Sequence, residues 1–256
     1  MAGGMQDNGT YLKTAPGENQ PWNDIFGGDG GYTAATPEAV FWYASFQESQ
    51  IYRLTLDKQA GLTSFARVDP VGGSDFLFIN PFVLDPNNYN RMYLAGGVDI
   101  WRNNNLSQIP GGSQKPTSIN WDRIEIEGLG SSITAMDIST TPANILYLGT
   151  NTGSLMKIEN ASTGGGEIST LPSGIGYLAN ITIDPANADN LFVINSNYGI
   201  PSILYSKNGG NTFEDVGGNL EEFPSGRGNG PSIRWSEIVP LSNGEYKYFV
   251  GTSSGL

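Results

Sequence analysis

A unit of short strands recurs along this chain, and it limits the folds that the chain can form. Each copy opens with an alternating apolar strand that ends in Asp-Pro or a variant, as in residues 82–86 and 181–185. A second apolar strand that carries an aromatic residue follows, and then a third strand. The second-strand aromatics lie 52, 54, 45 and 57 residues apart, at Phe41, Tyr93, Tyr147, Phe192 and Phe249. Each interval has room for four short strands and their turns, which is typical of one propeller blade.

The repeat predicts an all-β fold, a β-propeller of four-stranded antiparallel blades with about five blades in this chain. Apolar residues nowhere recur at the spacing of three and four that an amphipathic helix requires. The 35 glycines and 15 prolines fit a chain with many tight turns. The outermost strand of each blade is predicted at residues 22–26, 65–68, 121–126, 168–171 and 213–216.

The two ends of the chain each resemble half of a blade. Residues 1–26 are predicted to hold the third and fourth strands, and residues 232–256 the first and second. Pairing of these N- and C-terminal strands would close a ring, so that residues 1–256 form a single propeller domain. The alternative is that the chain is an excerpt of a larger propeller, cut from a longer secreted protein.

Composition excludes several classes of function. The chain has 25 acidic and 13 basic residues, a net charge of -12, so a phosphate backbone would be repelled and no nucleic-acid partner is expected. It has no histidine and no cysteine, which excludes a Ser-His-Asp triad, thiolate nucleophiles and Cys-ligated metals. No apolar run approaches the ~18 residues of a membrane-spanning helix, so no membrane insertion is expected.

Residues 206–213, Ser-Lys-Asn-Gly-Gly-Asn-Thr-Phe, carry a family resemblance. They are similar to the Asp-box of BNR-repeat propellers, Ser-x-Asp-x-Gly-x-Thr-Trp, with Asn208 for the aspartate and Phe213 for the tryptophan. The polar side chain of Asn208 is predicted to bond the backbone of its own hairpin, and Gly210 to adopt a positive φ. This hairpin is interpreted as a folding device rather than a site.

Two glycine-rich stretches, residues 3–10 and 27–31, resemble loops of sortilin-like and xyloglucanase-like BNR propellers. Such proteins are often secreted by bacteria. The resemblance therefore implies a secreted or cell-surface bacterial protein, and it extends at the level of the repeat over nearly the whole chain.

In a propeller, the loops that join second to third strands and blade to blade gather at one end of the central channel, where function usually lies. The residues expected on this face include Gln47, Glu48 and Asp75. The candidate ligand-binding residues are Gln6, Asp7, Asn8, Asp29, Asp99 and Trp235.

Asp7, Asp29 and Asp99 are also the candidate catalytic residues. Glycoside hydrolysis needs only two carboxylates across a cleft, one protonated and one ionised, and no histidine. The alternative is that an aspartate beside glycine is a turn residue that bonds its own backbone. A sialidase is not favoured, because the chain has no Arg-Ile-Pro motif; Arg53 and Arg102 are expected to pair with neighbouring acids.

The sequence also has candidate calcium ligands and five tryptophans that could bind a sugar. The oxygen-rich loops could hold a structural calcium ion, but no EF-hand spacing is present, and no cofactor is predicted. Trp22, Trp42, Trp101 and Trp121 fall in predicted strands and are interpreted as core, whereas Trp235 is next to the 226–232 loop and could stack on a sugar.

These observations predict a non-catalytic, secreted binding or scaffold propeller. It would engage a glycan or a protein at the acidic mouth of its channel. The alternative is a glycoside hydrolase that resembles the xyloglucanase group and uses paired aspartates.

Overall fold

The computed structural model describes residues 2–13, 21–57, 59, 61–164, 166–172, 176–223 and 228–256. Over these ranges the chain is all-β. Its helical elements there are short 3-10 turns at Pro37–Ala39, Gln47–Ser49, Leu106–Gln108 and Gly218–Leu220. Among the described residues no helix has the length and apolar character needed to cross a membrane.

The chain divides into two compact units, one of Met1–Leu84 with Asn88–Ile124 and one of Asp85–Asn87 with Glu125–Leu256. The prediction of a single domain over residues 1–256 stays a prediction.

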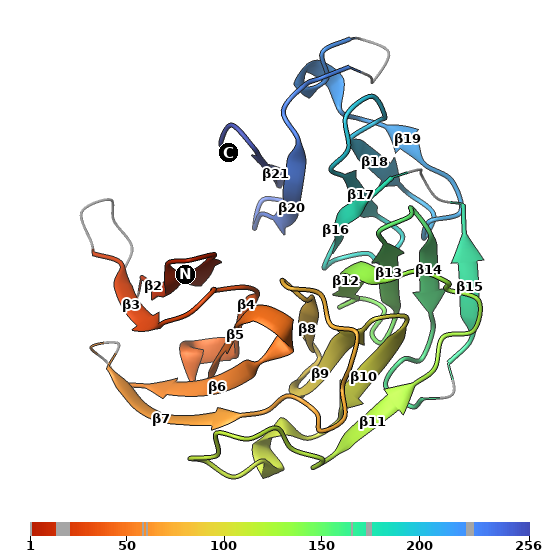
Figure 1. Cartoon of the computed structure of the whole chain (residues 1–256). Helices are drawn as coiled ribbons and strands as arrows, with labels where there is room; N and C mark the ends of the chain where they lie inside the picture. The colour runs from red at the N-terminus through yellow and green to blue at the C-terminus, as the bar shows by residue number, and fades with distance from the viewer. Residues whose placement is uncertain are drawn as a thin grey trace. The chain divides into compact units, whose positions relative to one another are not determined.

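The first unit contains three antiparallel sheets whose strands follow one another in chain order (Figure 1). The first sheet has three strands, β1 (Ala2–Met5), β2 (Gly9–Leu12) and β3 (Asn23–Phe26). The second has four, β4 (Thr33–Ala35), β5 (Trp42–Ser45), β6 (Ile51–Leu56) and β7 (Leu62–Arg67). The third also has four, β8 (Phe82–Asp85), β9 (Asn88–Gly96), β10 (Asp99–Asn103) and β11 (Trp121–Ile124).

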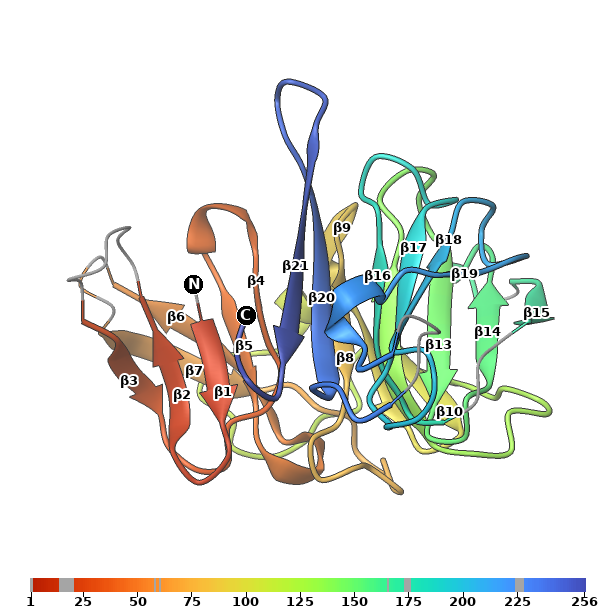
Figure 2. The ribbon, with the colours of Figure 1, turned by 90° about the horizontal axis from the view of Figure 1, so that it is seen from above.

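The second unit repeats this plan with two four-stranded sheets and a hairpin. The first sheet is β12 (Ile133–Ile138), β13 (Leu146–Thr150), β14 (Leu155–Ile158) and β15 (Ile168–Leu171). The second is β16 (Leu178–Ile183), β17 (Leu191–Asn195), β18 (Ile203–Ser206) and β19 (Glu214–Asp215). The hairpin is β20 (Ile233–Pro240) with β21 (Tyr246–Thr252), and its tip extends past β16 and β17 in Figure 2.

Within each unit, the core lies between consecutive sheets. In the first unit, Tyr43 and Ile51 of one sheet pack with Met92 and Leu94 of the next, and all four are at most 1 % exposed. In the second unit, Ala135 and Tyr147 pack in the same way against the following sheet. Because alternate residues of a strand point to opposite faces, each central sheet can bury both faces against its neighbours.

The structure confirms an all-β chain with several four-stranded antiparallel sheets. Four second-strand aromatics, at positions 93, 147, 192 and 249, lie in β9, β13, β17 and β21, while Phe41 directly precedes β5. The outer strand predicted at 168–171 coincides with β15, whereas the one at 213–216 shortens to β19.

Two predictions about strands and core residues were wrong. The first 26 residues hold three strands instead of two, because the glycine-rich segment before Gln6 also pairs as a strand. Trp22 is not a core residue: it precedes β3 and is 47 % exposed. Trp42 and Trp101 do pack against the core of the first unit, and Trp121 is buried.

The hairpin between β18 and β19 has the hydrogen bonds and the positive φ that were predicted for it. The side-chain oxygen of Asn208 accepts the backbone N–H of Thr212 at 2.9 Å, and its amide donates to the Thr212 hydroxyl. Ser206 Oγ accepts the Gly210 N–H at 2.9 Å, and Gly210 has the predicted positive φ, at 87°. Phe213 packs on the core of the second unit and anchors the turn.

Candidate functional site

Four connections of the first unit form what we call the loop cluster: residues 6–8 between β1 and β2, 27–32 between β3 and β4, 46–50 between β5 and β6, and 68–81 between β7 and β8. Contacts between successive loops join them into one surface.

The first two loops meet at Asp7 and Asp29. Asp29 Oδ1 accepts the backbone N–H of Asp7 at 2.8 Å, and Gly30 N–H donates to the Met5 carbonyl at 3.1 Å. The backbones approach so closely that a Cβ on Gly30 would lie 2.2 Å from the Gly9 carbonyl oxygen. Glycine at position 30 is therefore needed for the contact.

The third loop connects the second to the fourth. The Phe46 ring stacks on Phe26 with ring centroids 4.6 Å apart, which fixes the loop against the end of β3. Glu48 donates its backbone N–H to the Phe78 carbonyl at 3.0 Å. Phe78 itself is 48 % exposed, so an aromatic ring stands on the surface beside Glu48.

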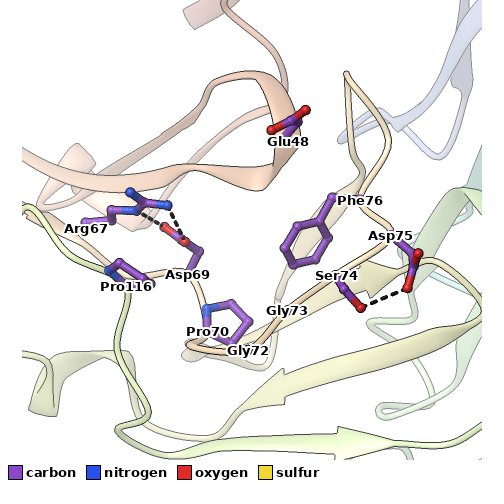
Figure 3. A pocket seen from close by; sticks show the side chains of 10 residues that line it. All are labelled: Glu48, Arg67, Asp69, Pro70, Gly72, Gly73, Ser74, Asp75, Phe76 and Pro116. Atoms are coloured by element: carbon purple, nitrogen blue, oxygen red, sulfur yellow. Dashed lines mark hydrogen bonds and ion pairs between the residues drawn. The ribbon is translucent and has the colours of Figure 1, made fainter.

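A hollow of about 420 Å³, which we call the loop hollow, opens beside the third and fourth loops (Figure 3). Its size falls in the range of small-molecule sites. In Figure 3 the Phe76 ring lies between an Arg67–Asp69 pair and a Ser74–Asp75 pair. The lining residues are Glu48, Arg67, Asp69, Pro70, Gly72, Gly73, Ser74, Asp75, Phe76 and Pro116.

Arg67 is held in the hollow by Asp69. Its Nε and one terminal nitrogen bond the two carboxylate oxygens at 2.8 and 3.0 Å, a bidentate pair. Asp69 is buried, and it also accepts the backbone N–H of Ile51 at 3.1 Å. The hydrogen bond to Asp69 is the main cause that raises the pKa of Arg67. The guanidinium is therefore a fixed, permanently charged group.

The loops that carry the acidic side chains are in left-handed conformations. Glu48, Ser49 and Asp75 have φ of 55°, 59° and 60°, a region that non-glycine residues seldom adopt. Ser74 Oγ donates to Asp75 at 2.8 Å. Such conformations cost free energy and persist where the surrounding structure enforces them, often at ligand sites.

Two polar atoms next to Glu48 lack a partner. Gln47 Oε1 and Ser49 Oγ are buried and have no hydrogen bond among the described residues, and Ser49 is 1 % exposed. Buried polar atoms are normally hydrogen-bonded, to protein or to ordered water. This loop therefore retains unused hydrogen-bonding capacity.

The structure brings several predicted site residues together in the loop cluster. Gln6, Asp7 and Asn8 form an exposed turn, closed by an Asn8 amide bond to the Gln6 carbonyl at 3.1 Å. Asp29 is partly buried and uses one carboxylate oxygen to hold that turn. Asp29 thus bonds the backbone of a different loop, not that of its own turn as the alternative to catalysis predicted.

Asp99 and Trp235 lie elsewhere. Asp99 begins β10, is 6 % exposed and forms an ion pair with Arg123, whose Nε is 2.8 Å from Oδ2. Trp235 belongs to the second unit, on β20, and is 46 % exposed. Of the loop before it, residues 226 and 227 lie outside the described residues.

The two arginines at equivalent third-strand positions differ. Arg102 contacts Asp122 at 3.3 Å, as expected. Arg53 instead donates to two backbone carbonyls, of Leu106 at 2.5 Å and Ile109 at 2.7 Å, so its predicted acidic partner was wrong.

The second unit contains a carboxylate pair that the sequence analysis did not single out. Asp137 on β12 accepts the N–H groups of Ile138 and Ile183, each at 2.8 Å. Burial raises the pKa of Asp137 to about 7, against the effect of these hydrogen bonds, and Glu237 on β20 adds to the increase. The residue Glu237 is exposed, but its carboxyl group is partly buried, and this burial raises the pKa of Glu237. A hydrogen bond with Trp235 opposes the increase.

Metal ligands do not cluster in the described part of the chain. No group of three or more acidic side chains there is placed to hold a metal ion. The structural calcium ion stays a prediction, without support from side-chain ligands.

The loop hollow itself was not predicted. Gln47, Glu48 and Asp75 were placed on the correct loops but not chosen, and Arg67 and Phe76 were missed. The available signal was the Gly72–Asp75 segment, which follows the last strand of a sheet as residues 27–31 do.

No protein-family model matches the chain, and no curated protein is similar to it. Arguments about function therefore depend on the geometry above. A fixed cation, two exposed acids and an aromatic ring around a hollow can together bind a polar molecule with an apolar face.

Proposed function

We propose that this chain is a secreted, non-catalytic binding module, a β-propeller of the BNR-repeat kind, which engages a glycan through the loop cluster. The observation that carries the proposal is the loop hollow, which combines the Phe76 ring, the fixed Arg67 and the acceptor Glu48. Four consecutive four-stranded meanders support the propeller architecture, with about five blades.

Sugars need this combination of groups. The ring of an aromatic residue covers the apolar face of a pyranose, and charged side chains donate to and accept from its hydroxyl groups with stronger hydrogen bonds than neutral ones. Phe76 and the exposed Phe78 supply rings, Arg67 supplies donors, and Glu48 and Asp75 supply acceptors.

We favour binding over catalysis because two of the predicted catalytic aspartates are already engaged in hydrogen bonds or ion pairs within the protein. Asp29 holds the Asp7 turn, and Asp99 is buried in an ion pair with Arg123. A glycosidase needs both carboxyl groups free to face the scissile bond.

The alternative is a glycoside hydrolase, and one observation in the second unit favours it. The charge of Glu237 contributes to the raised pKa of Asp137, and partial burial raises the pKa of Glu237 itself. A carboxyl group that stays protonated near neutral pH can act as a general acid.

A glycan array and a polysaccharide digestion on the same purified chain test the two functions. Binding without release of reducing ends, unchanged in Asp137→Asn, is the result expected for the module. Release of oligosaccharide that disappears in Asp137→Asn or in Asp29→Asn would establish the enzyme instead. Binding of proteins but of no glycan would replace the glycan by a protein partner.

A further inference from the structure

We infer that the loop hollow selects glycans that carry a free ammonium group, that is, amino sugars that are not acetylated. This inference rests on the proposed glycan binding and adds the chemical class of the ligand. It follows from the charged side chains around the hollow, some of which are paired with an opposite charge of the protein and some of which are not.

Three carboxylates and one guanidinium line the loop hollow. Arg67 and Asp69 form a bidentate pair and cancel each other, since both oxygens of Asp69 are engaged by Arg67. Glu48 and Asp75 remain, and neither has a cationic partner in the described part of the chain. A ligand in this hollow therefore meets two uncompensated negative charges.

The hollow also has the second feature of an ammonium site. The Phe76 ring lines it, and an aromatic face attracts a cation through its quadrupole. An N-acetyl group has no charge and would leave both carboxylates uncompensated, whereas an ammonium group offers three N–H donors.

Two buried polar atoms without a hydrogen-bond partner among the described residues, Gln47 Oε1 and Ser49 Oγ, flank Glu48 in its loop. Gln47 Oε1 accepts only, and it is buried without a donor among the described residues. Glu48 and Ser49 have a left-handed backbone conformation. Gln47 and Ser49 do not line the hollow, so a water molecule that bridges them to a ligand at Glu48 would satisfy these atoms.

The test uses two oligosaccharides of equal length, one of glucosamine and one of N-acetylglucosamine, at mildly acidic pH where the free amine is protonated. Binding is measured by titration calorimetry at low and high salt. We expect the glucosamine oligomer to bind at least about tenfold more tightly, with the difference shrinking as salt screens the charges.

Three variants locate the effect. Glu48→Gln and Asp75→Asn keep the side-chain shape, and asparagine tolerates the left-handed backbone at position 75. Each is expected to weaken binding of the glucosamine oligomer about tenfold and binding of the N-acetylated oligomer much less, because the amide oxygen of the variant can still accept a hydrogen bond from a sugar hydroxyl group. Glu127→Gln, an exposed acid of the second unit, is the control and should change neither. Thermal melting verifies that all three variants are folded.

Equal affinity for the two oligomers, or a preference unaffected by Glu48→Gln and Asp75→Asn, would overturn the inference while leaving the proposed glycan binding intact. Failure to bind any glycan, here and on the array, would overturn both. Binding of a lysine-rich peptide but of neither oligomer would assign the hollow to a protein partner and also overturn both.

Discussion

At the scale of single residues, Asp137 links protonation to stability in the second unit. Its carboxyl group accepts two backbone N–H groups, one from its own strand and one from β16. Burial nevertheless raises its pKa from an ordinary 3.8 to about 7, so the folded protein holds this proton more tightly than the unfolded chain does.

The stabilisation from Asp137 is therefore complete below about pH 4 and is lost as the pH rises through about 7. We expect the free energy of unfolding of the second unit to fall by up to ~1.4 kcal/mol per pH unit in this window. Glu237 acts in the same direction. Urea titrations between acidic and neutral pH measure the slope.

Asp137→Asn should flatten this slope, because asparagine does not titrate. It should also lose ~1–3 kcal/mol at acidic pH, since one of the two N–H groups then lacks an acceptor. An unchanged slope in the variant would show that Asp137 is not the group responsible.

Asn208 is the second residue with a defined effect. Its side chain bonds both the N–H and the hydroxyl of Thr212, so Asn208→Ala should lower the free energy of unfolding by ~1–2 kcal/mol. Asn211→Ala, which keeps these bonds, is the matched control and should cost less. Equal losses in the two variants would contradict the structural role of Asn208 in the hairpin between β18 and β19.

At the scale of elements, Arg53 ties β6 to the 3-10 turn between β10 and β11. Two of its nitrogens donate to the carbonyls of Leu106 and Ile109, and its guanidinium lies over the Phe41 ring, 5.1 Å from the centroid. One side chain thus joins the second and third sheets of the first unit.

Arg53→Lys should therefore be destabilising although the charge is retained. A single ammonium cannot reproduce the two forked contacts and the planar stacking, and we expect a loss of ~2–3 kcal/mol in chemical denaturation. Arg91→Lys, on the same unit, is a comparison for the generic cost of the exchange. A loss no larger for Arg53→Lys than for Arg91→Lys would contradict this role.

The element scale also indicates what the sequence could predict. The alternation and the aromatic repeat located most strands, since both arise from residues that face a neighbouring sheet. They did not locate β1, because Gly3 and Gly4 carry no pattern of alternation. The loop hollow could not be predicted either, since it depends on the Arg67–Asp69 pair and on backbone conformations at Glu48 and Asp75 that tertiary contacts impose.

At the scale of the whole molecule, the proposed propeller requires that the N- and C-terminal strands pair to close a ring. The ring closed by pairing of the N- and C-terminal strands stays a prediction. A composite of β1–β3 with β20–β21 would hold five strands, one more than the four-stranded sheets.

Cysteine cross-linking tests closure, because the chain has no native cysteine. One cysteine is placed in residues 2–12 and one in residues 246–256, and oxidation is followed by mobility on a gel. A closed ring predicts rapid intramolecular disulfides for pairs in one register and none for pairs displaced from it. Absence of cross-links from every register would contradict the closed ring.

The binding function itself belongs to this scale, and the loop hollow is its centre. Phe76→Leu removes the flat ring while keeping an apolar side chain against the core of the first unit. Phe249→Leu, an exposed aromatic of the second unit, is the control.

The most direct measurement is a calorimetric titration of the wild type and these two variants with the glycan that binds most strongly on the array. We predict a weakening of about tenfold or more for Phe76→Leu and no change for Phe249→Leu. Unchanged affinity in a folded Phe76→Leu variant would contradict the assignment of glycan binding to the loop hollow.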